Sequence, residues 1–227
     1  MAILEVFYAP GKLFSSLESR RGAWVLPLIL TMLLSLATNV FAIKKIGMES
    51  IVRQRVQSIN LSPEQMQQAM DRANSPAQLY GTYAGTIIGV PLILAAIAGL
   101  LMIFALVGSK QPKFGVSFSM VTLAWFPYVL IVCIMSVLVL MVAPDPTTLD
   151  STNLLSTNIA AFVDKDTTSK GLYSLLTSMD ILSFAEIGLL SYGFSKVNRT
   201  SMSFALFSVL SLWFVYVLIR MGLSIIF

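Results

Sequence analysis

The apolar run at residues 80–108 constrains the fold of this chain more than any other feature. It reads YGTYAGTIIGVPLILAAIAGLLMIFALVG and contains no Asp, Glu, Lys or Arg. A helix that crosses a bilayer needs about 20 predominantly apolar residues, and this run is longer. Charged residues make up 11% of the chain, whereas soluble domains contain about 25%. The sequence therefore predicts an integral membrane protein.

Five apolar segments predict an all-α membrane protein with five transmembrane helices in a single membrane domain, residues 1–227. No polar segment is long enough to form a second domain. The last two segments are separated by SKVNRTS and are expected to form an antiparallel hairpin. The expected spans are about 23–43, 80–108, 116–142, 172–194 and 202–227.

The polar segments between the spans also carry helical patterns. In residues 1–22, apolar side chains recur at helical spacing among polar ones, which is typical of an N-terminal interfacial helix. A short helix that caps the bundle is an equal alternative. In the connector 44–76, Ser62 is a candidate N-cap and Pro63 the first helical residue. Residues 143–171 form a second polar loop, expected to be helical in part.

The charges of the short loops predict the orientation. Loops 109–115 and 195–200 contain Lys and Arg but no acid, and basic loops stay on the cytoplasmic side. The N-terminus is then cytoplasmic, and the C-terminus and loop 143–171 are extracytoplasmic. Connector 44–76 is the weak point, because this orientation places Lys44 and Lys45 outside.

The composition excludes several kinds of chemistry. The chain has no His and a single cysteine, Cys133. Catalytic Ser-His-Asp and Cys-His groups, imidazole metal sites and an internal disulfide are therefore absent. The aspartates of loop 143–171 lack the EF-hand spacing, and no basic run of the nucleic-acid-binding type occurs. We expect no enzymatic activity, no cofactor, no metal and no nucleic acid.

Three charged residues inside the expected spans are the candidate site: Asp180, Glu186 and Arg220. A charge in hydrocarbon is costly unless it is paired or functional. At about 1.5 Å per residue, Asp180 and Arg220 lie roughly 12 and 10 Å from the same membrane surface, which predicts an ion pair between them. In the alternative, Arg220 reaches the outer headgroups and Asp180 lines a cavity.

Glu186 is expected roughly 21 Å into its span, near the bilayer centre. We expect it to face the bundle interior and to be neutral or hydrogen-bonded to a hydroxyl or a backbone oxygen. A role as a proton or ion site and a purely structural role are equally compatible with this position.

Glycines and prolines mark expected features of helix geometry. Gly81, Gly85 and Gly89 form two overlapping GxxxG steps, which allow close helix packing within the chain or, in the alternative, a dimer seam. Pro91 and Pro127 are expected to kink the second and third spans.

Three stretches resemble one known family. They are VFYAPGKLFSSLESRRGAWVLPLIL (6–30), AWFPYVL (124–130) and LLTSMDILSFAEIGLLSYGFSKV (175–197). In order and spacing they are similar to the signatures of the Yip family, the Ypt/Rab-interacting membrane proteins, in its bacterial form. Asp180 matches a signature position. Bacterial relatives usually have an Ile-Trp pair where this chain has Phe184-Ala185-Glu186, so no family role carries over to Glu186.

The resemblance implies a five-helix bundle with a cytoplasmic N-terminus in a bacterial inner membrane, and no known reaction. Some bacterial members are thought to accompany ABC exporters. The favoured hypothesis is a non-enzymatic accessory or scaffold protein that binds membrane lipids or a membrane protein such as an ABC exporter. The alternative is a small transporter or channel that uses Asp180 and Glu186. Whether the chain forms oligomers is left open.

Overall fold

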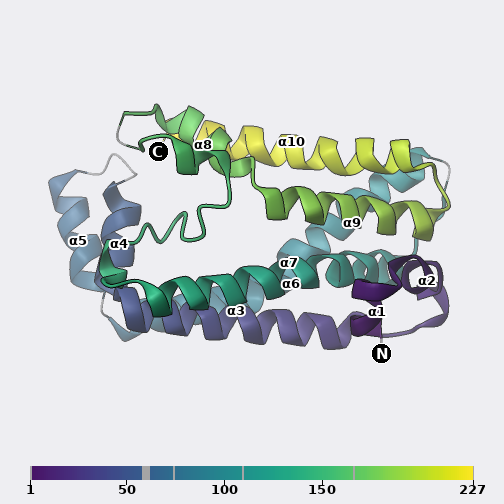
Figure 1. Ribbon diagram of the computed structural model, residues 1–227, viewed down its shortest axis with the longest axis horizontal. Helices are drawn as coiled ribbons and strands as arrows, with labels where there is room; N and C mark the ends of the chain where they lie inside the picture. The colour runs from purple at the N-terminus through teal and green to yellow at the C-terminus, as the bar shows by residue number, and fades with distance from the viewer. Residues whose placement is uncertain (1, 58–61, 74, 109, 166, 227) are drawn as a thin grey trace. The chain divides into compact units, whose positions relative to one another are not determined.

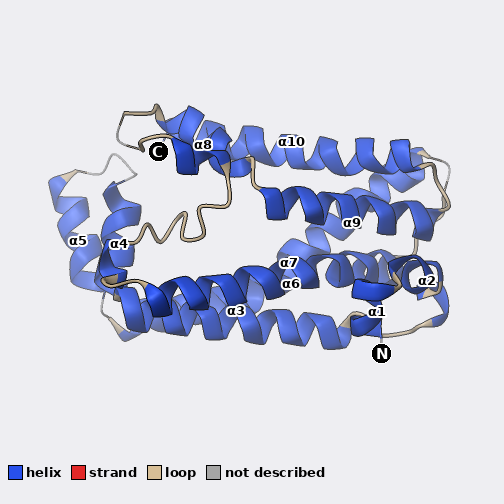
Figure 2. Ribbon diagram, in the orientation of Figure 1, coloured by secondary structure: helices blue, strands red, loops and turns tan. Residues whose placement is uncertain are grey.

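The computed structural model describes residues 2–57, 62–73, 75–108, 110–165 and 167–226. Within these ranges all regular elements are helices and no strand occurs (Figures 1 and 2), which confirms the all-α prediction. The α-helices are α1 (Ala2–Tyr8), α2 (Pro10–Ser15), α3 (Val25–Ile46), α4 (Met48–Gln57), α5 (Pro63–Ala73), α6 (Pro76–Val107), α7 (Phe114–Val142), α8 (Lys170–Ser178), α9 (Ile181–Asn198) and α10 (Met202–Ile226). The 3-10 turns are η1 (Leu17–Ser19), η2 (Pro146–Thr148) and η3 (Ile159–Phe162).

Four of these helices are long and apolar enough to cross a membrane: α3, α6, α7 and α10. Each one covers an expected span to within a few residues. The multi-pass membrane character predicted from the sequence is therefore supported by the length and composition of these helices.

The segment expected as one span at 172–194 is not one helix. It is divided into α8, which ends at Ser178, and α9, which begins at Ile181. The expectation of one continuous helix over this segment was therefore wrong. The residue directly before α9 is Asp180, and aspartate is among the preferred residues at the position that precedes a helix.

Helix starts follow the local sequence signals. Before α5, the Ser62 backbone N–H donates to Gln65 Oε1 at 3.0 Å, and the Gln65 N–H donates to Ser62 Oγ at 3.3 Å. This reciprocal pair is a capping box, and it confirms Ser62 as the N-cap with Pro63 in the first helical position. Before α6, the Gln78 N–H donates to Ser75 Oγ at 3.2 Å, so the second Ser-Pro sequence also begins a helix.

The chain divides into two compact units. Unit 1 comprises residues 1–33, 88–131 and 181–216, and unit 2 comprises residues 34–87, 132–180 and 217–227. Helices α3, α6, α7 and α10 contribute residues to both units.

Unit 1 contains the larger hydrophobic core. Its buried cluster draws on α1, α2, α3, α6, α7, α9 and α10. Phe14 of α2 and Phe194 of α9 are each 1% exposed. Beside Gly193 of α9, a Cβ would lie 3.0 Å from Met120 Cγ and 3.2 Å from the Phe14 ring. The N-terminal segment thus packs on α9, as a helix that caps the bundle would, while Leu4, Phe7 and Tyr8 of α1 remain exposed.

Unit 2 contains a smaller cluster and more polar contacts. Ile46, Ile51 and Leu140 are buried together. In the same unit, Asn39 Nδ2 donates to Thr86 Oγ1 at 2.9 Å between α3 and α6. The loop after α7 is fastened mainly by hydrogen bonds.

Candidate functional site

The break between α8 and α9 is the strongest candidate site, because it places the acid Asp180 between two helices of an apolar segment. Discontinuous helices occur at the binding sites of many transporters. Here the backbone of the break pairs with the loop after α7. Asn158 and Asp180 form an isolated antiparallel bridge, and the Ile159 N–H donates to the Met179 carbonyl at 3.3 Å.

The carboxylate of Asp180 is held by the same loop. Thr157 Oγ1 donates a short hydrogen bond to Asp180 Oδ2. The side-chain bond and the backbone bridge at Asn158 involve neighbouring loop residues, so the loop is fixed to the break at two successive positions. Asp180 therefore joins two segments of unit 2.

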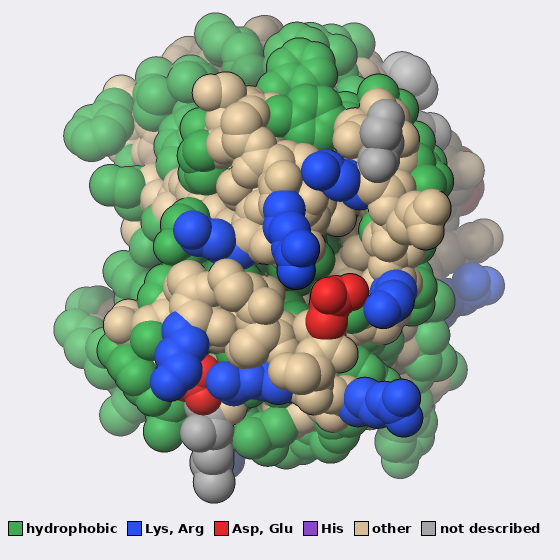
Figure 3. All heavy atoms as spheres, turned by 90° about the vertical axis from the view of Figure 1, so that its right-hand side faces the viewer, with side chains coloured by type: hydrophobic (Ala, Val, Ile, Leu, Met, Phe, Trp, Pro, Cys, Tyr) green, Lys and Arg blue, Asp and Glu red, His purple; other side chains and the backbone are tan. Residues whose placement is uncertain are grey.

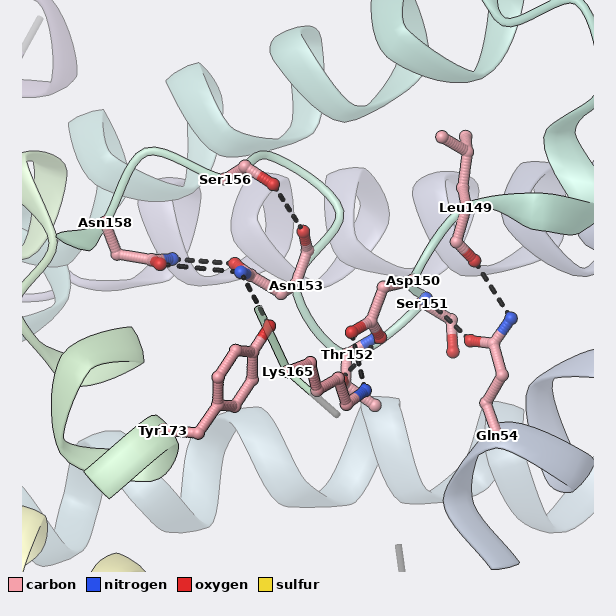
Figure 4. A network of polar contacts seen from close by, with 10 residues as sticks. All are labelled: Gln54, Leu149, Asp150, Ser151, Thr152, Asn153, Ser156, Asn158, Lys165 and Tyr173. Atoms are coloured by element: carbon pink, nitrogen blue, oxygen red, sulfur yellow. Dashed lines mark hydrogen bonds and ion pairs between the residues drawn. The ribbon is translucent and has the colours of Figure 1, made fainter. Parts of the chain in front are cut away.

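A polar network extends from this point through the loop (Figure 4). Asn158 Nδ2 donates to Asn153 Oδ1 at 2.7 Å, and the reverse contact measures 3.4 Å. Asn153 Nδ2 also lies 3.5 Å from the Tyr173 hydroxyl of α8. Asn158 is buried, and a buried amide needs such partners because an unsatisfied polar group is costly.

Gln54 of α4 fastens the other end of the loop. Its Nε2 donates to the Leu149 carbonyl at 2.9 Å, and its Oε1 accepts from the Ser151 N–H at 2.8 Å (Figure 4). One side chain therefore satisfies both a backbone acceptor and a backbone donor of the loop, in the manner of a neighbouring strand.

An ion pair closes the middle of the loop. Lys165 Nζ lies 2.7 Å from Asp150 Oδ2, and the ammonium is 5.7 Å from the centroid of the Tyr173 ring. Partial burial raises the pKa of the Asp150 carboxyl, but hydrogen bonds from Lys165 and Thr152 outweigh this effect and hold the pKa below its ordinary value. Asp150 is therefore an ionised anchor at neutral pH.

Arg220 reaches the break but contacts a different group from the one expected. Its Nη1 donates to Ser178 Oγ at 3.2 Å, and Ser178 Oγ donates to the Ser174 carbonyl at 2.9 Å. The expected Asp180–Arg220 pair is not among the four ion pairs of the described residues. The residue that Arg220 contacts, Ser178, lies two positions before Asp180, so the predicted depth of Arg220 was close. Depth alone does not determine the direction in which each side chain points.

Glu186 belongs to unit 1, whereas Asp180 belongs to unit 2. It is partly buried on α9. Within the described part of the chain, the Glu186 carboxyl forms no hydrogen bond and no ion pair, so the hydroxyl or backbone partner that we expected is not seen. The two acids that were predicted to lie inside one span therefore belong to different units.

The predicted packing glycines lie in open space. A Cβ built on Gly81, Gly85 or Gly89 meets no atom within 4 Å, so the prediction of a tight helix crossing within the chain was wrong at these residues, and the dimer seam stays a prediction. Close approaches occur instead at Gly193 and at Gly11, whose Cβ would lie 2.6 Å from the Tyr192 hydroxyl. Pro91 and Pro127 lie inside α6 and α7, which continue through them; the kinks remain predictions.

An apolar groove of about 490 Å³ lies beside α8 in unit 2. Leu172, Leu175, Met221 and Ile225 supply most of its wall, and Lys170 also lines it. Among all the described residues, no group of three or more His, Cys, Asp or Glu side chains could hold a metal ion. Cys133 is a buried free thiol.

Sequence reasoning missed the partners of Asp180. Nothing in the local pattern singles out Thr157 or Asn158, which contact Asp180 from a distant part of the sequence, or Gln54, which holds the other end of the same loop. The signal that could have located the break is Asp180 itself, since an aspartate inside an apolar run is a candidate N-cap.

We compared the chain with known protein families, curated proteins and solved structures. No family model, curated protein or solved structure matches the chain.

Proposed function

We propose that the chain is a non-enzymatic membrane accessory protein that binds lipid or another membrane protein. The observation that carries this proposal is the engagement of Asp180. Thr157 and the backbone of Asn158 hold it at the helix break, which favours a structural joint over an open ion site.

The proposal includes a fifth crossing, formed by α8 and α9 together. At 1.5 Å per residue, the 18 residues of α9 extend about 27 Å, close to the roughly 30 Å hydrocarbon core. Helix α8 adds nine residues on the other side of the break. Such an interrupted crossing is tolerated when its free backbone groups find partners within the protein, and here the loop bridge supplies them.

The sequence resemblance supports the finer parts of the proposal. These are membership of the Yip family, a bacterial inner membrane, a cytoplasmic N-terminus and an ABC exporter as one candidate partner. The amphipathic pattern of residues 1–22 supports an interfacial segment there. The basic loops 109–115 and 195–200 support the same orientation.

Partner capture in native membranes tests the proposed function. Photo-crosslinkers placed at exposed, apolar positions such as Ile88 and Phe207 should yield a membrane protein adduct that is identified by mass spectrometry. The yield should be the same for wild type and for Glu186→Gln, because an accessory role does not need this acid. Adducts formed at random with abundant proteins, without a recurrent partner, would contradict a protein-binding role.

A transporter or channel is the second candidate function. Glu186 supports it, because a carboxyl on an apolar helix that has no hydrogen-bond or ion-pair partner among the described residues can mark an ion or proton pathway. Liposomes that contain the purified protein and a pH-sensitive dye separate the two functions. We expect no proton flux above that of protein-free liposomes. A flux that disappears in Glu186→Gln would instead establish the transporter.

Site-specific labelling tests the orientation. In a Cys133→Ala background, single cysteines at Gln111 and Thr152, both exposed, should react with an impermeant maleimide from opposite faces of the membrane. Labelling from the same face would overturn the five-span topology.

A further inference from the structure

One end of unit 1 carries a concentration of positive charge. Residues 1–22, 108–115 and 195–201 contain seven Lys or Arg side chains but two acids, Glu5 and Glu18. Figure 3 shows basic side chains spread over this face of the molecule, with few acidic ones between them.

The two acids neutralise two of the cations. Arg20 binds Glu5 through two hydrogen bonds of 2.9 Å each, and Lys113 Nζ lies 3.3 Å from Glu18 Oε1. The remaining cations form what we call the basic end. Its members, none of which forms an ion pair within the described residues, are Lys12, Arg21, Lys110, Lys196 and Arg199.

Contacts inside unit 1 hold the three segments of the basic end together. Gly11, next to Lys12, lies against Tyr192, and the Lys196 ammonium is 5.3 Å from the centroid of the same ring. Gly108, two residues before Lys110, lies against the Phe204 ring. The cations therefore belong to one surface that is fixed by the fold.

The position of the basic end along the helices matches the depth of lipid headgroups. Lys110 follows the last residue of α6 by three positions, and Lys196 lies in the last turn of α9. Cations at the ends of membrane helices lie at the level of the phosphates. An anionic leaflet attracts such cations strongly.

The apolar neighbours of the basic end favour a lipid over an acidic protein. Leu4, Phe7 and Tyr8 of α1 are 57%, 52% and 73% exposed. A helix that presents exposed aromatic residues beside cations is typical of a segment in the membrane interface. We propose that the basic end binds the headgroups of anionic phospholipids in the adjacent leaflet. This inference deepens the proposed function, on which it rests, by naming the lipid class and the surface.

Lipid selectivity in reconstituted membranes tests the inference. The purified full chain is placed in phosphatidylcholine liposomes with traces of spin-labelled phosphatidylglycerol or phosphatidylcholine, and the motionally restricted fraction gives a relative association constant. The basic-end variant replaces Lys12, Arg21, Lys110, Lys196 and Arg199 by Gln. The matched control replaces five unit 2 cations by Gln, namely Lys44, Lys45, Arg53, Arg72 and Lys170.

We expect wild type to select phosphatidylglycerol over phosphatidylcholine. Removal of each cation that contacts a headgroup should lower the relative association constant about fivefold. The basic-end variant should lose the selectivity and the control should retain it. Equal loss in both variants, or no selectivity in wild type, would overturn the inference. If the basic-end variant does not fold, raising the salt concentration on wild type provides the same test, because exposed charge interactions are screened.

The outcome is separable from that of the proposed function. Capture of a membrane protein partner without lipid selectivity would leave the accessory role standing and remove the lipid surface. Capture of an acidic protein that depends on the basic end, in the absence of lipid selectivity, would likewise assign this surface to a protein and overturn the inference.

Discussion

In unit 1, Phe14 and Phe194 are buried within one large hydrophobic cluster, whereas the cluster in unit 2 consists of Ile46, Ile51 and Leu140. Unit 2 instead fastens its long loop with Gln54 and Asp180. Lipid tails are as apolar as leucine, so apolar burial alone does not drive membrane helices together. Membrane helices are held together instead by close packing and by polar contacts. Unit 1 relies mainly on close packing, and unit 2 relies more on polar contacts.

The charges are distributed just as unevenly. Unit 2 has eight basic and eight acidic residues, so the net charge of +4 of the whole chain lies in unit 1. Two acids of unit 2, Asp150 and Asp180, anchor a loop, while most cations of unit 1 remain available to an external anion. Positive charge that the fold does not use internally points to an interaction outside the chain.

Removal of the Phe14 side chain should have the largest effect on stability. Phe14 is 1% exposed and lies against Gly193, and a buried Phe→Ala change costs about 3–5 kcal/mol. Phe14→Ala should therefore lower the thermal midpoint in detergent strongly. Phe207→Ala, at a residue that is 64% exposed, is the matched control. Equal midpoints for the two variants would show that the N-terminal segment contributes nothing to the core of unit 1.

Substitution of glycines should separate close packing from open surface. Gly193→Leu meets Met120 and the Phe14 ring, and overpacking costs about 1–3 kcal/mol. Gly188→Leu, in the same helix α9 but with no atom within 4 Å, should change stability by less than about 0.5 kcal/mol, as should Gly85→Leu in α6. Thermal unfolding of the three variants gives the comparison. A large loss at Gly85 would restore the original prediction of a tight seam.

The difference between Gly193 and Gly85 shows how far the sequence could predict this fold. Helix lengths and starts were accessible, because apolar run lengths and the Ser-Pro sequences at Ser62 and Ser75 act locally. The packing site was not accessible. Small residues at GxxxG spacing show where a neighbour could approach, but the position of the neighbour depends on the whole bundle.

The candidate site was predicted in part for the same reason. Asp180 and Arg220 were identified because a charge in an apolar run is costly wherever it lies. Their partners, Thr157 and Ser178, depend on loop conformation and on rotation about the helix axis. Spacing along the sequence determines depth but neither of these.

The polar fastening of unit 2 can be measured with a double-mutant cycle. Thr157→Val and Asp180→Asn should each destabilise, since a hydrogen bond to a charged group contributes about 1.5–3 kcal/mol. The double variant should cost clearly less than the sum of the two. The cycle between Asp180→Asn and Arg220→Gln should show a smaller coupling, because Arg220 donates to Ser178. If the Asp180–Arg220 coupling is instead larger than the Thr157–Asp180 coupling, the predicted ion pair between Asp180 and Arg220 would be supported.

Acidification should loosen the loop of unit 2 through Asp150. Its folded pKa lies below the ordinary value of 3.8, so its contribution is complete above that value and is lost as the pH falls through the folded pKa. Lys165 and Asp150 are partly exposed, and such a pair contributes about 0.2–1 kcal/mol. Hydrogen-exchange protection factors of residues 149–165, corrected for intrinsic rates, should therefore fall modestly between pH 6 and pH 3.

The Lys165→Gln variant identifies the source of that fall. Without the ammonium, protection of the loop should already be lower at pH 6 and should change less on acidification. Lys113→Gln is the matched control, because it removes the comparable pair with Glu18 in unit 1 and should leave the loop unchanged. If Lys165→Gln keeps the full pH dependence of wild type, then Asp150 does not anchor this loop through its charge. The polar fastening of unit 2 would then depend on the other contacts of the loop, among them those of Gln54, Asp180 and Asn158.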